Sequence, residues 1–167
     1  MRHIVLISGK DSLATALVQT AYRPGLSYEY VFNDVEAELP ETYAWMRTVE
    51  AKTGWDIKRV GKSLPAKIRS YGGFLPGPRA RYCTRECKID PTEEYIGADD
   101  CTVYYGLRAD EQRIGYVPIG KPNITPVYPL RDHSIDLQGV FSILDARGLV
   151  PPDFFWPRLH GAVAASP

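Results

Sequence analysis

The chain has 167 residues, with 20 basic and 20 acidic side chains and hence a formal net charge of zero. This balance gives no indication of nucleic-acid or membrane binding through overall charge, and the length suits one globular domain. Three cysteines do not make a disulfide framework, and no apolar stretch approaches the ~20 residues of a membrane span, so we expect a cytoplasmic protein without a membrane partner.

The first predicted element is a strand over residues 4–7, because four consecutive apolar residues suit a strand buried on both faces of a parallel sheet. Apolar residues then recur at helical spacing over residues 13–20, with Ser8 or Asp11 placed to cap the first turn. Free N–H groups at a helix start attract anions, and Lys10 adds a positive charge. The turn is therefore a candidate phosphate site. The alternative is an ordinary strand–helix turn with a solvated lysine.

Strands and helices continue to alternate along the chain. We predict strands over residues 28–32, 56–60, 102–105 and 126–130, with the second of these at a sheet edge and the last, rich in proline, at an edge or in a loop. We predict helices from Pro40 to Gly54 and over residues 65–70, 91–96 and 137–144, with an irregular stretch over residues 72–88. This alternation predicts an α/β fold with a doubly wound, Rossmann-like parallel sheet and helices on both faces. We expect a single domain over residues 1–161 and a flexible tail over residues 162–167.

Three polar segments follow predicted strands, at residues 8–12, 33–36 and 108–111. Parallel sheets bind ligands beyond the carboxyl ends of their strands, at the point where the strand order reverses. We therefore expect these three segments to converge on one site.

Several short motifs carry a resemblance to known enzymes. The first turn reads Ile-Ser-Gly-Lys-Asp-Ser and resembles the PP-loop, usually Ser-Gly-Gly-Lys-Asp-Ser, with Ser8 here at the first glycine position. Asp34 follows the second strand, and Pro-Glu-Thr opens the next helix at residues 40–42. Residues 83–91 read Cys-Thr-x-x-x-Lys-x-x-Pro, and residues 106–111 read Gly-x-Arg-x-x-Glu. In this order they resemble the phosphoadenosine phosphosulfate (PAPS) reductase-like family of the PP-loop, adenine-nucleotide α-hydrolase-like superfamily, over about residues 4–130.

The resemblance implies about five strands in the order 3-2-1-4-5 and an enzyme that binds ATP or a related adenine nucleotide, with Mg²⁺. Our first hypothesis is an ATP pyrophosphatase, in which an acceptor attacks the α-phosphate and pyrophosphate leaves. One alternative is a PAPS or adenylyl sulfate reductase, although family reductases carry a nucleophilic cysteine near the C-terminus and none follows Cys101 here. Another is a non-catalytic nucleotide-binding module or subunit. The acceptor, and whether the chain forms a homodimer, stay open.

The resemblance also implies roles for particular residues. It assigns catalysis to Lys10, Asp11 and Arg108. For Asp34, a contact with adenosine or a metal ion competes with an Asx turn. Nucleotide and phosphate binding fall to Ser8, Gly9, Lys10, Asp11, Ser12, Asp34, Gly106, Arg108 and Glu111.

Four basic residues cluster before the helix predicted over residues 91–96: Arg79, Arg81, Arg85 and Lys88. Guanidinium groups bind phosphate or sulfate at two points, so we predict that this arm holds the substrate anion. The Gly- and Pro-rich residues 72–78 ahead of it favour a mobile lid, and the alternative is a solvated loop face.

Cys83 and Cys87 lie four residues apart and could share a helix face. Zinc sites usually need two closely spaced pairs, and iron–sulfur clusters three or four cysteines. We therefore expect inert thiols rather than a redox pair or an iron–sulfur cluster, no certain metal ligand, and Cys101 in the core.

Overall fold

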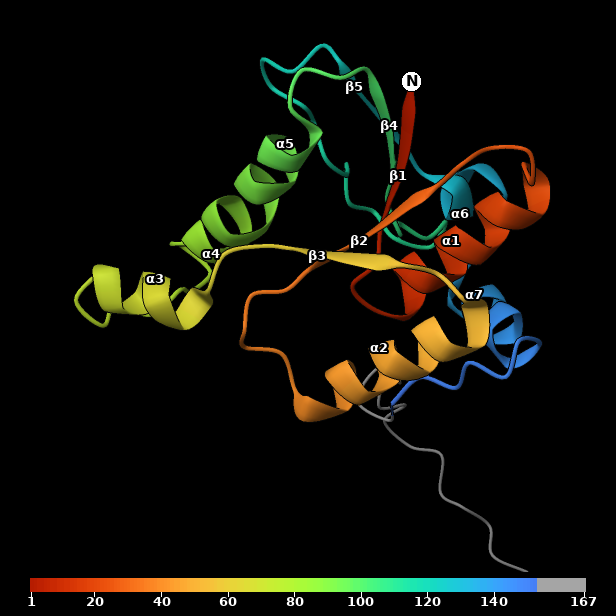
Figure 1. Ribbon diagram of the computed structural model, residues 1–167, viewed down its shortest axis with the longest axis horizontal. Helices are drawn as coiled ribbons and strands as arrows, with labels where there is room; N and C mark the ends of the chain where they lie inside the picture. Colours follow the sequence, from red (N-terminus) through yellow and green to blue (C-terminus); the bar gives the residue numbers. More distant parts are fainter. Residues whose placement is uncertain (153–167) are drawn as a thin grey trace, which may run out of the picture.

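One sheet of five parallel strands forms the centre of the computed structural model, which describes residues 1–152 (Figure 1). The strands run in the order β3-β2-β1-β4-β5, so the predicted fold class and strand order are confirmed. Both strands predicted for an edge, β3 and β5, lie at the edges. The predicted tail, and the domain boundary at residue 161, lie outside the described residues. The strands are β1 (Arg2–Leu6), β2 (Glu29–Asn33), β3 (Ile57–Val60), β4 (Cys101–Tyr104) and β5 (Ile124–Val127).

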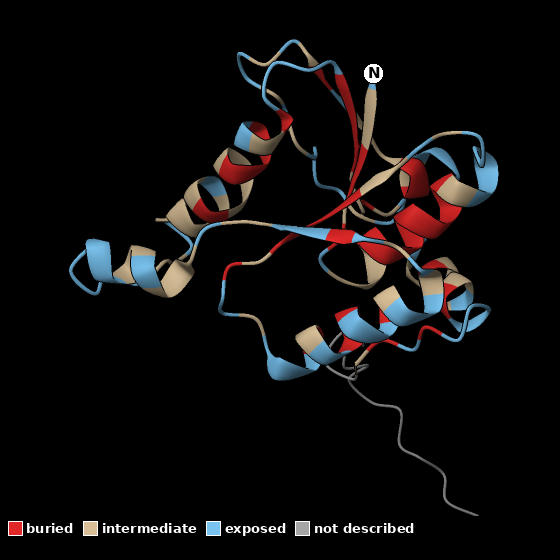
Figure 2. Ribbon diagram, in the orientation of Figure 1, coloured by how far each residue is buried: buried red, intermediate tan, exposed pale blue. Residues whose placement is uncertain are grey.

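Helices cover both faces of this sheet, as predicted. Val5 belongs to a core that includes Leu17 and Leu144, whereas its neighbour Ile4 packs in a second core with Ile96. Ile4 and Val5 are both fully buried, which is the burial that an unbroken apolar run predicts. Figure 2 shows buried residues along the central strands and in α1. The first core is covered by α1 (Lys10–Tyr22), α2 (Pro40–Thr53), α6 (Pro129–Asp132) and α7 (Leu137–Asp145), and the second by α5 (Asp90–Ile96).

The connection from β3 to β4 is more helical than predicted. After α3 (Leu64–Ser70), a helical run begins at α4 (Tyr82–Thr84) and continues through a π-helical turn, η1 (Arg85–Ile89), into α5. The helix predicted over residues 91–96 is present as α5, but it continues this helical run instead of starting separately at Pro91, because the run accommodates the proline. Pro91 has no N–H for the carbonyl of Cys87, and the amide of Lys62 donates to that carbonyl at 3.2 Å instead.

The C-terminal elements follow their local sequence signals. The predicted strand over residues 126–130 ends earlier, because Pro129 takes the first turn of α6. Asp136 caps α7 by accepting the Gly139 amide at 2.9 Å. Within residues 1–152, no helix is long and apolar enough to span a membrane.

Candidate functional site

The turn between β1 and α1 is closed by the hydroxyl of Ser12. Its Oγ accepts the amides of Ser8 and Gly9 at 2.8 and 3.0 Å and donates to the Gly9 carbonyl at 2.9 Å. Gly9 is the N-cap, so the predicted capping by Ser8 or Asp11 is wrong. Instead, the hydroxyl of Ser12, in the first turn of the helix, accepts the amides of Ser8 and Gly9 and so closes the helix start. Because the first amides of a helix lack intrahelical acceptors, those of Lys10, Asp11 and Ser12 remain as donors at the helix start.

Gly106 brings the segment after β4 into contact with this helix start. A Cβ at Gly106 would lie 2.5 Å from the Ser12 nitrogen and 2.7 Å from the Asp11 carbonyl carbon. Such distances are within hard contact, so this position requires glycine. The close approach places Arg108 beside the turn although it lies far along the chain.

Asp11 is the centre of a charged network at this contact. Its carboxylate accepts hydrogen bonds from Lys10 Nζ at 3.0 and 3.1 Å and from Arg108 Nη1 at 3.0 Å. Arg108 Nε donates to Asp110 at 2.9 Å, and the Arg108 amide donates to Glu111 at 3.1 Å. Burial alone lowers the pKa of the Arg108 guanidinium, but the surrounding carboxylates outweigh burial and raise it. The hydrogen bond from Arg108 to the Asp110 carboxylate lowers the pKa of Asp110. The network therefore fixes a charged guanidinium next to the turn.

A cavity of about 660 Å³ opens at the carboxyl ends of the strands, in front of the turn. Its wall combines residues 8–12, residues 105–107, the helical residues 84 and 88–89, and the loop residues 113–116. Three cationic side chains line it, Lys10, Lys88 and Arg113, against the single carboxylate of Asp11. Of the three polar segments expected to converge, the first forms the wall, the third lies beside it through Arg108, and the second contributes only Asn33.

Comparison with known proteins adds to this geometry. Residues 2–116, more than half of the chain, match the family model described as the phosphoadenosine phosphosulfate reductase domain.

The chain belongs to this PAPS reductase domain family. Among solved structures, the chain is similar to the phosphoadenylyl-sulfate (PAPS) reductase of Candida auris in a phosphate complex, with a TM-score of 0.66 and 16% identity. The match covers 90% of this chain and 75% of that chain, and at this identity it shows the fold alone. No curated protein matches the sequence. The resemblance seen in the motifs is thus confirmed at the level of the family.

Asp34 lies at the edge of this site rather than in the cavity wall. Its Oδ1 accepts the Glu36 amide at 2.9 Å, which forms the Asx turn weighed above, and the Tyr43 hydroxyl at 2.8 Å. Arg59 Nη1 lies 3.7 Å from the other oxygen. The carboxylate is therefore engaged locally, and its contact with a nucleotide or metal stays a prediction.

The structure divides the predicted basic arm. Lys88 lines the cavity and lies 3.3 Å from a carboxylate oxygen of Glu38. Arg85 is exposed and forms an ion pair with the first residue of α5. Arg79 and Arg81 lie on an exposed loop outside the cavity wall, and neither has an ion pair among residues 1–152. The geometry thus places one of the four arm residues where it can contact an anion in the cavity.

The three cysteines are free thiols: Cys83 and Cys87 lie in the helical run, and Cys101 lies in β4. Burial raises the pKa of the Cys87 thiol, and it raises that of Cys101, at the start of β4, to about 11. Cys83 is half-buried one turn before Cys87. In residues 1–152, no group of three or more His, Cys, Asp or Glu side chains is arranged to hold a metal ion. Cys101 packs in the second core, as predicted.

Sequence reasoning missed the aromatic wall of the cavity. Tyr105 lies between Tyr116 and Tyr128, with ring centroids 5.4 and 5.9 Å away. Tyr105 and Tyr128 each directly follow a strand in the structure. The strands predicted over residues 102–105 and 126–130 included both residues, so the search for segments after strands did not find them. Tyr116 gave no such signal, because it lies in a loop without a periodic pattern.

A recess of about 170 Å³ adjoins the cavity and shares its aromatic wall. Its polar floor holds the hydrogen bond from the Thr92 hydroxyl to Asn33 Oδ1 at 3.0 Å, and the bond from the Tyr116 hydroxyl to Glu93 at 2.7 Å. The site therefore combines the turn, where Lys10 adds a positive charge, with an aromatic end that has buried polar groups and also includes Lys88.

Proposed function

We propose that this protein binds an adenine nucleotide, with its phosphates at the β1–α1 turn, and catalyses attack of an acceptor on the α-phosphate. The acceptor forms a bond to the α-phosphorus, the bond from that phosphorus to the bridging oxygen breaks, and pyrophosphate leaves with the electron pair. The observation that carries the proposal is the charge of the cavity wall. Three cations and one carboxylate line the cavity beside the open amides of a helix start. Two of these cations, Lys88 and Arg113, also pair with glutamates outside the lining.

Lys10 supplies the mobile charge in this scheme. In the structure its ammonium group bonds to Asp11, whose carboxylate also accepts from Arg108. When phosphate enters, Lys10 can move to it while Arg108 continues to neutralise Asp11. The charge that develops on the leaving pyrophosphate is then stabilised by Lys10 and by the amides at the helix start.

The aromatic end of the cavity suits the base of the nucleotide. Tyr105 and Tyr116 offer ring faces for stacking, and the adjoining recess offers the Asn33 amide and the Glu93 carboxylate to the edge of a purine. This end and the turn are parts of one continuous wall, so a nucleotide can contact both.

A predicted Mg²⁺ ion does not fit the side chains alone. Proteins usually hold Mg²⁺ through one or two carboxylates together with substrate phosphates. Asp11 is the one carboxylate among the described cavity-lining residues, and Lys10 and Arg108 already occupy its oxygens. We therefore assign charge neutralisation to this chain's own cations and amides.

The second candidate is sulfonucleotide reduction, which the family itself favours. Cys83 is the thiol best placed for it, because it neighbours Thr84 in the cavity wall. That reaction needs a thiolate nucleophile that can approach the substrate sulfur. Burial keeps the pKa of the Cys87 thiol raised, and the sequence has no cysteine after Cys101.

One experiment separates the two reactions. Full-length protein is incubated with thioredoxin and either PAPS or adenylyl sulfate, and in parallel with ATP and candidate acceptors. We expect no sulfite, and pyrophosphate release from ATP that depends on an acceptor and persists in Cys83→Ser. Sulfite release that disappears in Cys83→Ser would show that the reductase assignment is right. Nucleotide binding without turnover of any substrate would favour a non-catalytic module.

A further inference from the structure

The neutral charge of the chain hides a strongly uneven distribution. Residues 61–88, which we call the basic projection, carry seven basic side chains and one acidic one, Glu86. Since the whole chain is neutral, the remaining residues carry the compensating negative charge. The basic projection includes α3, α4 and most of η1, and Figure 1 shows α3 standing away from the sheet. A concentration of one charge on a projecting segment attracts a polyanion.

Part of this positive charge is uncompensated. Lys67 pairs with Glu86 at 2.6 Å, and Lys62, Arg85 and Lys88 pair with acidic residues outside the basic projection. In contrast, three guanidinium groups have no ion pair or side-chain hydrogen bond among the described residues: Arg69, Arg79 and Arg81. Arginine forks match phosphate geometry better than any other side chain does.

Exposed aromatic rings lie between these arginines in the sequence. Phe74 is 59% exposed and Tyr71 is 45% exposed. A phenylalanine side chain is normally buried in the core of a folded protein. Tyr82 holds both in place, with ring centroids 4.8 Å from Tyr71 and 6.4 Å from Phe74. The Tyr82 hydroxyl also donates to the Phe74 carbonyl at 2.5 Å, which fixes the loop that carries the ring. The result is a supported aromatic platform, formed by Tyr71, Phe74 and Tyr82, in the same segment as the three arginines.

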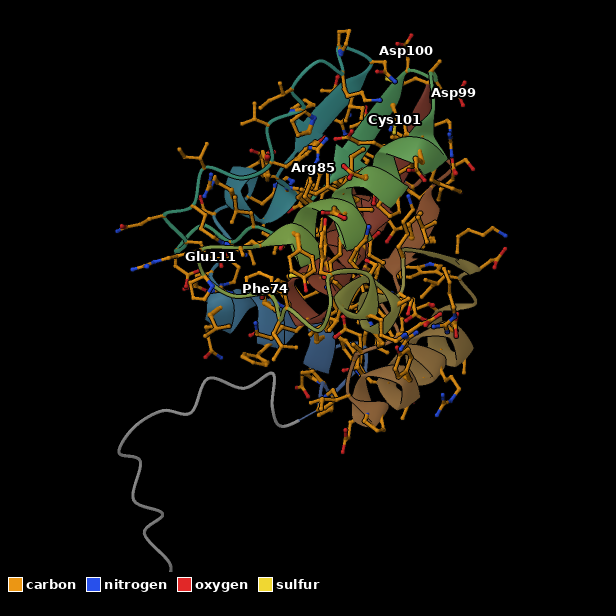
Figure 3. All side chains as sticks on the ribbon, turned by 90° about the vertical axis from the view of Figure 1, so that its left-hand side faces the viewer. Phe74, Arg85, Asp99, Asp100, Cys101 and Glu111 are labelled. Carbon is orange, nitrogen blue, oxygen red and sulfur yellow. The ribbon has the colours of Figure 1, made fainter. Side chains whose placement is uncertain are left out.

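The platform leads directly to the cavity. The helical run that starts at Tyr82 continues to Thr84, Lys88 and Ile89, which line the cavity wall. Figure 3, which looks onto this end of the molecule, shows Phe74 and Arg85 on the side that faces the viewer. A polymer held on the platform would therefore pass the mouth of the nucleotide site.

We propose that the basic projection binds a single strand of nucleic acid. Its phosphates contact Arg69, Arg79 and Arg81, and an unstacked base lies on Phe74 and Tyr71. RNA and DNA share the phosphates and bases that this surface recognises, so both are expected to bind. Given the proposed function, which this last step rests on, the strand presents its acceptor group to the activated nucleotide in the cavity.

The pairing of free arginines with exposed rings favours this partner over an acidic protein. A carboxylate-rich segment would satisfy the guanidinium groups but would leave Phe74 and Tyr71 uncovered. Double-stranded nucleic acid keeps its bases stacked and would leave the same rings unused. A single strand uses both features together.

The proposal is tested by fluorescence anisotropy with labelled oligothymidylate and oligouridylate of about 12 nucleotides. This length lies within the ~4–16 nucleotides that single-strand-binding folds cover. We expect binding that weakens with salt, and Phe74→Ala should reduce affinity by about 5-fold or more while Phe74→Tyr retains it. The Arg79→Ala/Arg81→Ala variant should flatten the slope of log affinity against log salt by about 1.4, because each phosphate contact contributes about 0.7. The matched control is Arg23→Ala/Arg147→Ala, which removes two exposed arginines elsewhere and should bind like wild type.

Three results would overturn the proposal: no binding at low salt, equal binding by wild type and Phe74→Ala, or equal binding of polyglutamate or of a duplex of the same length. Lys10→Ala keeps this result separate from the proposed function. It should weaken ATP binding and leave oligonucleotide binding intact, whereas Phe74→Ala should leave ATP binding intact. If the wild-type protein binds only one of the two ligands, ATP or the oligonucleotide, the missing binding identifies which proposal has failed.

Discussion

The β1–α1 turn and the basic projection flank the same cavity, but they are built in opposite ways. The turn lies between a strand buried on both faces and a helix with eight successive buried residues, from Ser12 to Gln19. In α3 of the basic projection no residue is buried, and the segment depends on ring contacts and ion pairs. A change near the turn should therefore act through the backbone and the core. A change in the basic projection should act through charge and exposed rings, with little effect on folding.

Glycine substitutions give the largest expected difference between the two regions. Gly106→Ala places a Cβ 2.5 Å from the Ser12 nitrogen, so we expect it to lower the free energy of unfolding by roughly 1–3 kcal/mol and to weaken ATP binding. Gly77→Ala in the basic projection meets no atom within 4 Å, and we expect a change within about 0.5 kcal/mol. Urea unfolding of both variants measures this. Equal stability of the two would mean that the contact at Gly106 is not rigid.

The pH dependence of the unfolding free energy tests a buried group in the sheet, the thiol of Cys101 at the start of β4. Burial raises the pKa of Cys101 from 9.0 to about 11, so in this range the folded thiol keeps a proton that the unfolded one loses. Stability present below pH 9 is thus lost as the pH rises towards 11, by about 2 kcal/mol from this group. Cys101→Val should remove that part of the loss when unfolding free energies at pH 8 and pH 11 are compared. Parallel losses in the variant and wild type would show that this thiol titrates normally.

The smallest expected effect on folding belongs to the exposed arginines. Arg79→Ala combined with Arg81→Ala should change the free energy of unfolding by under about 0.5 kcal/mol, because neither side chain has an ion pair in the described structure. The same variant should raise KM or lower kcat if these residues bind substrate. Differential scanning calorimetry with steady-state assays checks both parts. A large fall in melting temperature would show that the arginines are structural.

The same contrast explains how much could be predicted from the sequence. The apolar run of β1, the helical spacing of α1 and the polar segments after strands are local signals, and they led to the fold class and the turn. The strand order came from the resemblance to the PAPS reductase-like family. The pair of Asp11 and Arg108 joins residues far apart in the chain, and its distance depends on the fit of Gly106 against the helix. No local pattern encodes such a fit.

The basic projection was the least predictable part because its helices depend on distant partners. The run before Pro91 is possible because the Lys62 amide satisfies the Cys87 carbonyl, and a proline read alone predicts a helix start. The separation of Lys88 from Arg79 and Arg81 follows from this same helical run, which turns only Lys88 towards the cavity. Overall net charge also concealed the local excess of positive charge.

Calorimetry of ATP and AMP binding to wild type and Lys10→Ala tests the central claim, that the β1–α1 turn binds the nucleotide phosphates. Lys58→Ala serves as the control, because Lys58 is an exposed lysine on edge strand β3. We predict that Lys10→Ala loses roughly 1.5–3 kcal/mol of ATP binding free energy, the range for hydrogen bonds to charged groups. AMP should lose less, since it lacks the two outer phosphates, and Lys58→Ala should bind both nucleotides normally. Wild-type affinity for ATP in Lys10→Ala would contradict the account.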